Sequence, residues 1–358
     1  MIKIGITQGD INSVNYEVIL KTFETEEMLS LCTPIVYGSP KIATYHRKSI
    51  DSQRTFNGTQ SAEEIKRGAL NVVNCFGEEE QKIELGNATE EAGKAAYVSL
   101  KKAVEDLKNG VIDALVTMPM NDQMVKLEGE TFAGQDEYIQ EMLGEGRRSM
   151  PVLISENFRV ALATTKLPIS KLSSSISREL LAEKIIVAHN TLKRDFFIDN
   201  PRIAILSLNP QYNAENECAE EKETIVPVID ELFKRGVRCF GPYAADEHFG
   251  TGNFQHFDTT LAMYYDQGNA PFKALAMNDG LCLTAGMPAV ITSPDNGLDY
   301  VNAGKGIADE SSFRHAIYTA IDIVRNRTRF DNERRNPLKK QYFEKRDDSD
   351  KLKLDQED

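Results

Sequence analysis

Short apolar runs alternate with amphipathic stretches along most of this 358-residue chain, and this alternation limits the fold more than any other feature. Short apolar runs between turn residues are typical of buried strands, and an apolar period of about 3.6 residues is typical of helices that cover a sheet. The sequence therefore predicts an α/β fold. The strand candidates are Lys3 to Ile6, Pro34 to Tyr37, Ala114 to Thr117, Val152 to Ile154, Arg159 to Ala163, Ile203 to Ser207, Thr260 to Tyr264 and Ala289 to Thr292.

Helical periodicity is clearest at Glu90 to Asn109, Ser177 to Arg194, Glu220 to Arg235 and Ser311 to Arg327. Thr89 is the expected N-cap of the first of these helices, since threonine accepts a hydrogen bond from a free amide of the first turn. The polar, weakly patterned segment from Ser49 to Ala69 is predicted to be a surface excursion. Apolar periodicity stops after Arg325, and we expect a charged tail at the C-terminus.

Composition excludes several classes of protein. The 42 basic and 55 acidic residues give a net charge of −13, which disfavours nucleic acids and anionic membranes as partners. No apolar run approaches the ~20 residues that span a bilayer, and Met1 to Ile6 enters a strand pattern directly, without a signal-peptide layout. We therefore expect a cytoplasmic protein.

The usual cofactor motifs are missing. The five cysteines are scattered without a C-x-x-C spacing, and none of the five histidines forms an H-x-x-x-H pair. No G-x-G-x-x-G lies between a strand and a helix, and no phosphate-binding G-x-x-x-x-G-K-[ST] occurs. The absence of these motifs argues neither for nor against a dinucleotide site.

Four segments instead carry a family resemblance. Thr7-Gln8-Gly9-Asp10 with Glu17 is similar to the motif T-x-G-D-P-x-G-I-G-P-E, although Ile11 to Tyr16 replace its proline and glycine positions. Ala163 to Pro168, Leu208 to Gln211 and Met263 to Gly268 are similar to three signature loops of the same family. From about Ile2 to about Arg327 the chain resembles PdxA, the NAD-dependent 4-hydroxythreonine-4-phosphate dehydrogenases of vitamin B6 synthesis.

The resemblance implies a two-lobed α/β/α fold like that of isocitrate and isopropylmalate dehydrogenases, with the active cleft between the lobes. The expected first lobe comprises residues 1–130 and 290–330, and the second lobe comprises 131–289. Residues 331–358 form the charged tail. A homodimer through the second lobe and a small-molecule substrate are implied as well.

In the family each signature loop gives one histidine to a divalent metal, and the matching positions here are Lys166, Gln211 and Tyr265. A protonated lysine repels a metal, while an amide and a phenol with a pKa near ~10 are poor ligands. We therefore expect no metal to be bound by this set, and NAD becomes the one cofactor that the resemblance leaves open.

The positions that contact substrate in the family are altered too. Gln135 and Asp136 stand where a histidine and a threonine contact the phosphorylated substrate, and Asp122 replaces a lysine. Cys282 and Ile291 occupy substrate-binding asparagine and arginine positions, and Lys273 alone is retained among the residues that grip the anion. Near the implied cofactor, Asn296 replaces a histidine beside Gly297.

Two arrangements of the remaining cleft residues stay open. In the first, Lys166 pairs with Asp246 or Asp266, and its ammonium fills the former metal volume. In the second, Lys166 and Tyr265 form a metal-free acid/base pair, in which the lysine lowers the phenol's pKa during hydride transfer.

The expected function is that of a PdxA-like protein, impaired or silent for the metal-dependent oxidative decarboxylation. Such a silent relative acts by binding, for instance as the partner of an active family member in a heterodimer. The alternative is an active NAD-dependent dehydrogenase that performs either the family reaction or a metal-free reaction on a different hydroxy acid.

Overall fold

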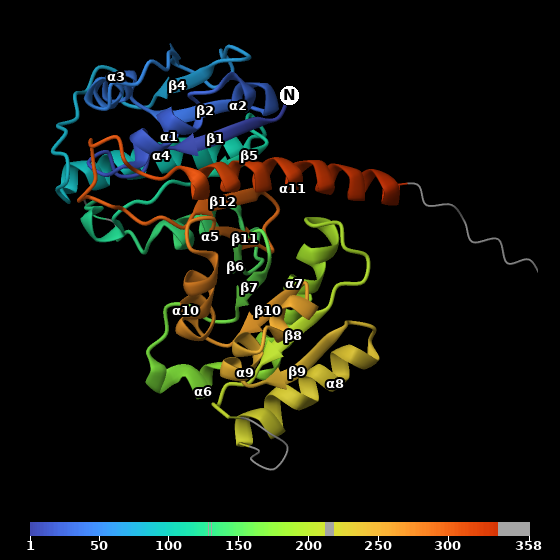
Figure 1. The fold of residues 1–358 in the computed structure, drawn as a ribbon. Coiled ribbons are helices and arrows are strands. Elements are labelled where there is room, and N and C mark those ends of the chain that lie inside the picture. The colour runs from blue at the N-terminus through green and yellow to red at the C-terminus, as the bar shows by residue number, and fades with distance from the viewer. Residues whose placement is uncertain (128, 130, 212–217, 336–358) are drawn as a thin grey trace, which may run out of the picture.

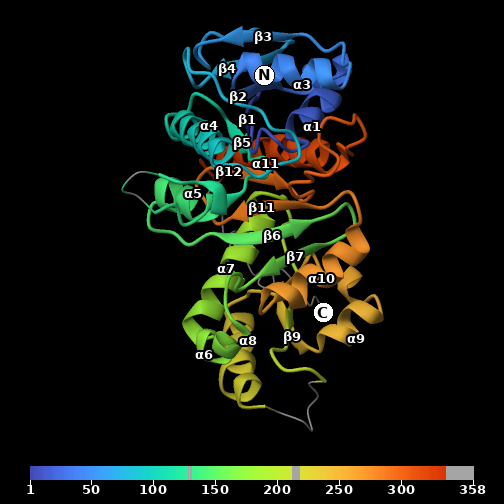
Figure 2. The ribbon, with the colours of Figure 1, turned by 90° about the vertical axis from the view of Figure 1, so that its left-hand side faces the viewer.

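One sheet runs through the whole molecule. The structure, a computed structural model, describes residues 1–127, 129, 131–211 and 218–335. In this part of the chain twelve strands form a sheet in the order β3-β4-β2-β1-β5-β12-β11-β6-β7-β10-β8-β9, and Figure 2 shows them stacked from β3 at the top to β9 at the bottom. The strands are β1 (Lys3–Thr7), β2 (Thr33–Gly38), β3 (Phe56–Thr59), β4 (Leu70–Asn74), β5 (Ala114–Val116), β6 (Met150–Ile154), β7 (Arg159–Leu162), β8 (Ile203–Leu206), β9 (Cys239–Tyr243), β10 (Thr259–Ala262), β11 (Leu281–Ala285) and β12 (Val290–Pro294).

The sheet is mixed. β11 is antiparallel to β12 and β6, and β6 is antiparallel to β7, whereas the other neighbouring strands are parallel. The predicted α/β class is confirmed. Strands β1 to β5 and β12 make one half of the sheet and β6 to β11 the other. Because the ladder continues from β12 into β11, the boundaries of the two lobes stay a prediction.

Helices cover both faces of this sheet (Figure 1). They are α1 (Asn15–Thr22), α2 (Glu26–Leu31), α3 (Pro40–Ser49), α4 (Glu90–Lys108), α5 (Gln135–Leu143), α6 (Leu172–Ser175), α7 (Arg178–Arg194), α8 (Val226–Lys234), α9 (Ala245–Gly250), α10 (Tyr265–Ala276) and α11 (Ser311–Arg335). The predicted N-cap of α4 is confirmed, since Thr89 Oγ1 accepts from the amide of Ala92 at 3.2 Å. Among these helices none has the length and apolarity needed to span a bilayer.

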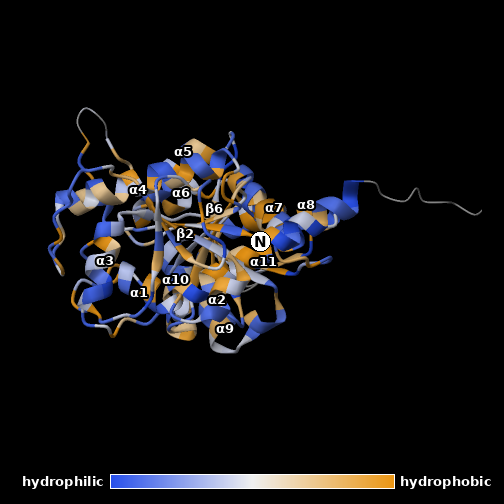
Figure 3. Cartoon of the chain, turned by 90° about the horizontal axis from the view of Figure 1, so that it is seen from above, coloured by the Kyte–Doolittle hydropathy of each residue, from blue (hydrophilic) through white to orange (hydrophobic). Residues whose placement is uncertain are grey.

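Helix α11 is longer than predicted. It lies against β12 and β5 and ends at Arg335 rather than Arg327, and its last turns leave the body of the protein (Figure 1). Those turns are hydrophilic in Figure 3, which explains why apolar periodicity missed them. Arg329 pairs with Glu333 one turn on at 2.9 Å and lies 4.2 Å above the ring of Phe197. Residues 336–358 of the predicted tail lie outside the described residues.

Side chains from both halves of the sheet form the core. Ile4, Val116, Leu283 and Ile205 have no exposed surface and belong to one apolar cluster. A second cluster joins Leu100 and Val104 of α4 to Ile139 and Leu143 of α5. Helix α5 therefore packs against the first half of the sheet, although it follows residue 130 in the chain.

Four strands were missed by the sequence prediction: β3, β4, β9 and β11. The segment predicted as a surface excursion contains β3, which is an edge strand paired only with β4 and only partly buried. Strand β9 contains Gly241 and Pro242, residues that are unfavourable in strands. The predicted surface excursion therefore contains a regular strand, Phe56–Thr59, at the edge of the sheet.

Candidate functional site

Three loops meet at the carboxyl ends of neighbouring strands in the second half of the sheet. Strands β7, β10 and β8 are neighbours and parallel, so their carboxyl ends lie side by side, which is where ligands bind in α/β sheets. The amide of Ala163 donates to Ala262 O at 2.8 Å, and Thr164 Oγ1 donates to Met263 O at 2.7 Å. The loops that carry Lys166, Gln211 and Tyr265 are thus brought together, as the resemblance implied.

A glutamine ties the loop after β10 to the loop after β8. Gln267 Oε1 accepts from the amide of Met263 at 2.7 Å, and its Nε2 donates to Ser207 O at 2.7 Å. Tyr265, by contrast, is 47% exposed at the start of α10, and Gln211 is exposed with φ of 53°. The backbone that carries the three loops is held in place, while the side chains at all three former ligand positions are exposed.

The buried residue Glu221 holds the loop after β8 through hydrogen bonds. The sequence did not predict this role. One carboxylate oxygen accepts from the amides of Leu208 and Asn209 at 2.8 and 2.9 Å, and the other accepts from Asn209 Nδ2 at 2.9 Å. The residue is fully buried in a π-helical turn, Glu221–Ile225, just before α8. Its position in a run of charged residues gave no signal of this role.

Lys166 has a different partner from the predicted ones. Its Nζ lies 2.8 and 2.9 Å from the two carboxylate oxygens of Glu137, in the first turn of α5. Asp246 and Asp266 are exposed at the starts of α9 and α10. The predicted pairing of Lys166 with either residue is wrong, because α5 places a carboxylate over the loop after β7.

Carboxylates dominate the electrostatics around this ammonium. Partial burial lowers the pKa of Lys166, but the hydrogen bond and charge of Glu137, with Asp136 and Asp122, outweigh burial and raise it. Burial raises the pKa of Asp122, against the effect of Lys166. The ammonium is therefore held protonated by its surroundings.

A small cavity of about 200 Å³ lies beside this ion pair. It is lined by the loop after β7, the start of α5, helix α7 and strands β6, β11 and β12. Its walls include Asp136, Glu137, Gln140, Ser149, Lys166, Lys184, Cys282, Thr284 and Ser293. Burial raises the pKa of the Cys282 thiol, and the charges of Asp136 and Asp295 raise it further. We refer to this cavity as the cleft pocket.

The other predicted substrate residues lie around the cleft pocket rather than in its walls. Ile291 is fully buried in β12, so its side chain belongs to the core. Lys273 forms an ion pair with Asp295 at 2.7 Å. The side-chain oxygen of Gln135 is buried without a hydrogen-bond partner in the described structure. Of the predicted substrate residues, Asp136 and Cys282 line the cavity.

The predicted cofactor positions lie after β12. The side-chain oxygen of Asn296 is buried and has no hydrogen-bond partner among the described residues, and a side-chain carbon at Gly297 would meet open space. Further along this loop, Tyr300 donates a hydrogen bond to Asp10 at 2.7 Å. An unpaired acceptor beside an open backbone fits a polar ligand such as a nicotinamide dinucleotide, which Asn296 and Gly297 would hold.

The altered opening motif forms its own hydrogen bonds. Asn15 Nδ2 donates to Pro119 O at 2.8 Å, and Tyr16 donates from its hydroxyl to Gln8 Oε1 at 2.8 Å. Any side chain at Gly9 would lie 2.3 Å from Asn15, and one at Gly38 would lie 2.3 Å from the hydroxyl of Tyr16. The substituted residues therefore fill the space beside two glycines.

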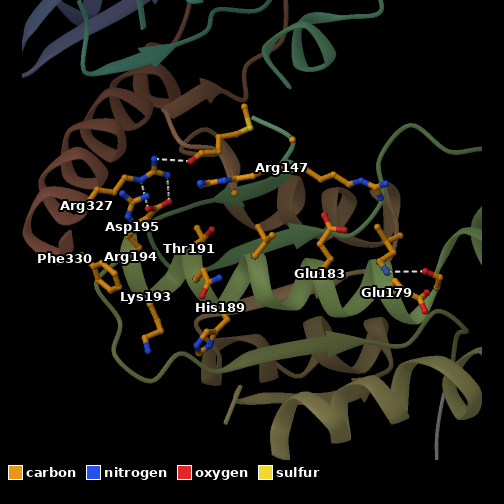
Figure 4. Close-up of a pocket in the computed structure, with 18 residues that line it drawn as sticks. Arg147, Glu179, Glu183, His189, Thr191, Lys193, Arg194, Asp195, Arg327 and Phe330 are labelled. Atoms are coloured by element: carbon orange, nitrogen blue, oxygen red, sulfur yellow. Dashed lines mark hydrogen bonds and ion pairs between the residues drawn. The ribbon is translucent and has the colours of Figure 1, made fainter. Parts of the chain in front are cut away.

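A larger cavity, of about 960 Å³, lies between α7 and α11 (Figure 4), and none of the predicted site residues lines it. Arg327 donates to both oxygens of Asp195 at 2.7 and 2.8 Å at one end of it, and Lys193 and His189 lie along α7. We place the candidate site at the cleft pocket instead, because the three signature loops meet there.

Comparison with known proteins identifies the family. The sequence profile described as pyridoxal phosphate biosynthetic protein PdxA matches residues 30–320. The chain belongs to the PdxA family. It is 54% identical to the 4-hydroxythreonine-4-phosphate dehydrogenase of Bacteroides thetaiotaomicron over 99% of this chain and 97% of that protein. It is 32% identical to the D-threonate 4-phosphate dehydrogenase of Cupriavidus necator over 90% and 98% of the two chains.

Solved structures agree with this assignment. A 4-hydroxythreonine-4-phosphate dehydrogenase from Burkholderia phymatum superposes with a TM-score of 0.74 at 30% identity, covering 90% of this chain and 98% of that one. A putative one from Salmonella typhimurium gives a TM-score of 0.78 at 26% identity, covering 90% and 99%. PdxA proteins are oxidoreductases, and the family implies a nicotinamide cofactor and a divalent metal.

The residues at the PdxA metal positions do not fit a divalent ion. Lys166 offers an ammonium that Glu137 holds protonated, Gln211 an exposed amide and Tyr265 a phenol. Zinc-like ions bind neutral imidazoles, thiolates or carboxylates. In the described residues no three histidine, cysteine or carboxylate side chains are grouped suitably for a metal. We therefore derive no catalytic step through a metal at these positions.

Proposed function

We propose that this PdxA-family chain is impaired or silent for the metal-dependent oxidative decarboxylation of 4-hydroxythreonine 4-phosphate, and that it acts by binding a small metabolite at the cleft pocket. The observation that carries the proposal is the Lys166–Glu137 ion pair. It places a protonated ammonium in the loop where the family resemblance implies a neutral metal ligand. The frame of the site is kept, because Gln267 and Glu221 still hold the loops after β10 and β8.

Electrostatics at the substrate side supports the same proposal. Asp122, Asp136 and Glu137 bring three carboxylates near one ammonium. A phosphorylated anion entering beside them meets like charges, which cost free energy wherever water is excluded. The phosphorylated family substrate is therefore a poor match for this pocket.

The metal-free dehydrogenase remains the second candidate, with NAD as its cofactor. It requires Lys166 to act on Tyr265, but in the described structure the ammonium is bound by both oxygens of Glu137. The unpaired oxygen of Asn296 and the open backbone at Gly297 are the observations in its favour. Turnover of an unphosphorylated hydroxy acid with NAD that is lost in Tyr265→Phe would favour this candidate over a silent protein.

Calorimetry with zinc and a rate measurement test the proposal directly. We expect no zinc binding at micromolar concentration and no NADH formation from 4-hydroxythreonine 4-phosphate. The triple variant K166H/Q211H/Y265H should gain zinc binding, since the loops already meet and histidine tolerates the φ of 53° at position 211. Lys166→Met is the matched control, because it removes the charge without adding a ligand. Zinc binding by the unchanged protein that is lost in Lys166→Met would overturn the proposal.

For assembly we propose a homodimer, or a heterodimer with an active relative, in the cytoplasm. The proposed interface is formed by the second lobe, as the family resemblance implies. Sedimentation equilibrium of the purified chain, alone and mixed with an active family member, tests both forms.

A further inference from the structure

Lys184 is a buried lysine that forms no ion pair with any residue in the described part of the chain. It lies on α7 with 6% of its surface exposed, and its Nζ donates to Ser149 O at 2.8 Å. An ammonium has three N–H groups, and among the described residues this one has no other acceptor and no carboxylate within ion-pair distance. A buried charge with unused donors is costly unless a ligand completes it.

Lys184 lines the cleft pocket at a point where hydrogen bonds connect three elements of the fold. Lys184 and its acceptor Ser149 both line this cavity. The amide of Ser149 donates to Gln140 Oε1 at 2.6 Å, so α5, the start of β6 and α7 are joined at this point. Burial lowers the pKa of Lys184, and the charge of Arg148 acts in the same direction. An anionic group in the cavity would act in the opposite direction and raise the pKa of Lys184.

The two lysines of the pocket lie in different electrostatic surroundings. The charged groups that act on Lys166 are Glu137, Asp136 and Asp122. Those that act on Lys184 are Glu183 and Arg148. The pocket therefore has a cationic side at Lys184 and an acidic side, where three carboxylates lie near the ammonium of Lys166. Among the described residues Asp136 forms no ion pair of its own, since Lys166 pairs with Glu137. A ligand that matches both sides carries a negative and a positive group.

The size of the cavity also favours a small ligand. Pockets for drug-sized ligands measure about 300–1,000 Å³, whereas this cavity is about 200 Å³, so it suits a small metabolite. A phosphate ester would add several atoms and negative charge at the acidic side.

We infer that the cleft pocket binds a small unphosphorylated amino acid, with its carboxylate on Lys184 and its ammonium at Asp136. This inference rests on the proposed function, since it names the class of metabolite for the same site. It assigns Lys184 as a binding residue and Asp136 as the residue that selects an amine over a hydroxyl.

Calorimetry with four compounds in buffer containing a chelator tests the inference: L-serine, L-threonine, L-glycerate and O-phospho-L-serine. L-Glycerate is serine with a hydroxyl in place of the amine. We expect L-serine or L-threonine to bind more tightly than L-glycerate and O-phospho-L-serine. Lys184→Met should weaken that binding at least tenfold, and Asp136→Asn should remove the preference for the amine.

Lys193→Met is the matched control, because Lys193 lies on the same helix but lines the larger cavity instead. If Lys184→Met fails to fold, Lys184→Gln replaces it, since its amide can still donate to Ser149 O. The inference is overturned if none of the four compounds binds at millimolar concentration, if O-phospho-L-serine binds most tightly, or if Lys184→Met binds as well as the unchanged chain. These outcomes are separate from zinc binding and NADH formation, which decide the proposed function.

Discussion

Lys166 and Glu137 join the loop after β7 to the first turn of α5, with both carboxylate oxygens within 2.9 Å of the ammonium. The two residues are 29 positions apart in the sequence, and neither belongs to a recognisable acid/base motif. Glu137 keeps Lys166 protonated, so a positive charge occupies the position of a PdxA metal ligand. The charge of Lys166 repels an incoming cation, and Glu137 competes with an incoming anion for the ammonium.

Glu137→Gln should leave the fold almost unchanged. The side chains of Lys166 and Glu137 are 58% and 42% exposed, and exposed ion pairs contribute less than about 1 kcal/mol. Urea denaturation of the variant should show a free energy of unfolding within about 1 kcal/mol of the unchanged chain. A loss of several kcal/mol would mean that the pair supports the structure rather than the pocket.

The buried pair of Arg327 and Asp195 should behave differently. Its side chains are 9% and 3% exposed, and removing one partner of a buried pair costs about 3–5 kcal/mol because the other charge stays unpaired. Asp195→Asn should therefore lower the free energy of unfolding by that amount in urea. Asp331→Asn is the control, since it breaks the exposed pair with Arg194 on the same surface and should cost less than about 1 kcal/mol.

Glu221→Ala should loosen the loop after β8. The substitution leaves the amides of Leu208 and Asn209 buried without an acceptor, at a cost of about 1–3 kcal/mol for each donor. Hydrogen exchange should show faster exchange at these two amides, with little change in β1 or β2. Unchanged exchange at both amides would show that Glu221 does not hold the loop.

Mild acid should destabilise the protein through two buried histidines. Burial lowers the pKa of His46 and of His248 from 6.5 to about 4. The unfolded chain therefore takes up protons first as the pH falls, and the stability that is present above pH 6.5 is lost between there and about pH 4. The loss should reach about 3 kcal/mol for each histidine.

Thermal unfolding at several pH values measures this effect. His46→Gln should flatten part of the pH dependence, because glutamine can donate to Ile11 O, which the ring nitrogen of His46 contacts at 2.9 Å, without titrating. His256→Gln is the control, since His256 is exposed. Equal slopes in the two variants would contradict the assignment of the acid sensitivity to His46.

The sequence predicted the elements whose patterns are local. Helix α4 was predicted at its observed start because its apolar stripe and its cap, Thr89, lie within the helix itself. Strand β3 was missed because an edge strand needs no continuous apolar run, and only its pairing with β4 defines it. The end of α11 was missed because Arg329 and Asp331 stabilise it through contacts with Phe197 and Arg194, far away in the sequence.

The sequence predicted which loops form the site, but it did not predict which side chains contact one another there. The family resemblance located the three loops, and the parallel order of β7, β10 and β8 brings them together. The partner of Lys166 was predicted wrongly, since the position of α5 depends on packing of Ile139 and Leu143 against α4. Lys184 and Glu221 carried no sequence signal, because their importance comes from burial that only the tertiary fold creates.

Asn15 and Tyr16 sit in the space beside Gly9 and Gly38, within 2.3 Å of where a side-chain carbon would be. Gly9 and Gly38 therefore cannot be replaced by larger residues while Asn15 and Tyr16 are present. Replacing Asn15 and Tyr16 with the family's glycine and proline would open two voids and remove their hydrogen bonds. Introducing the family's opening loop into this chain should therefore require compensating substitutions at the positions that contact Asn15 and Tyr16.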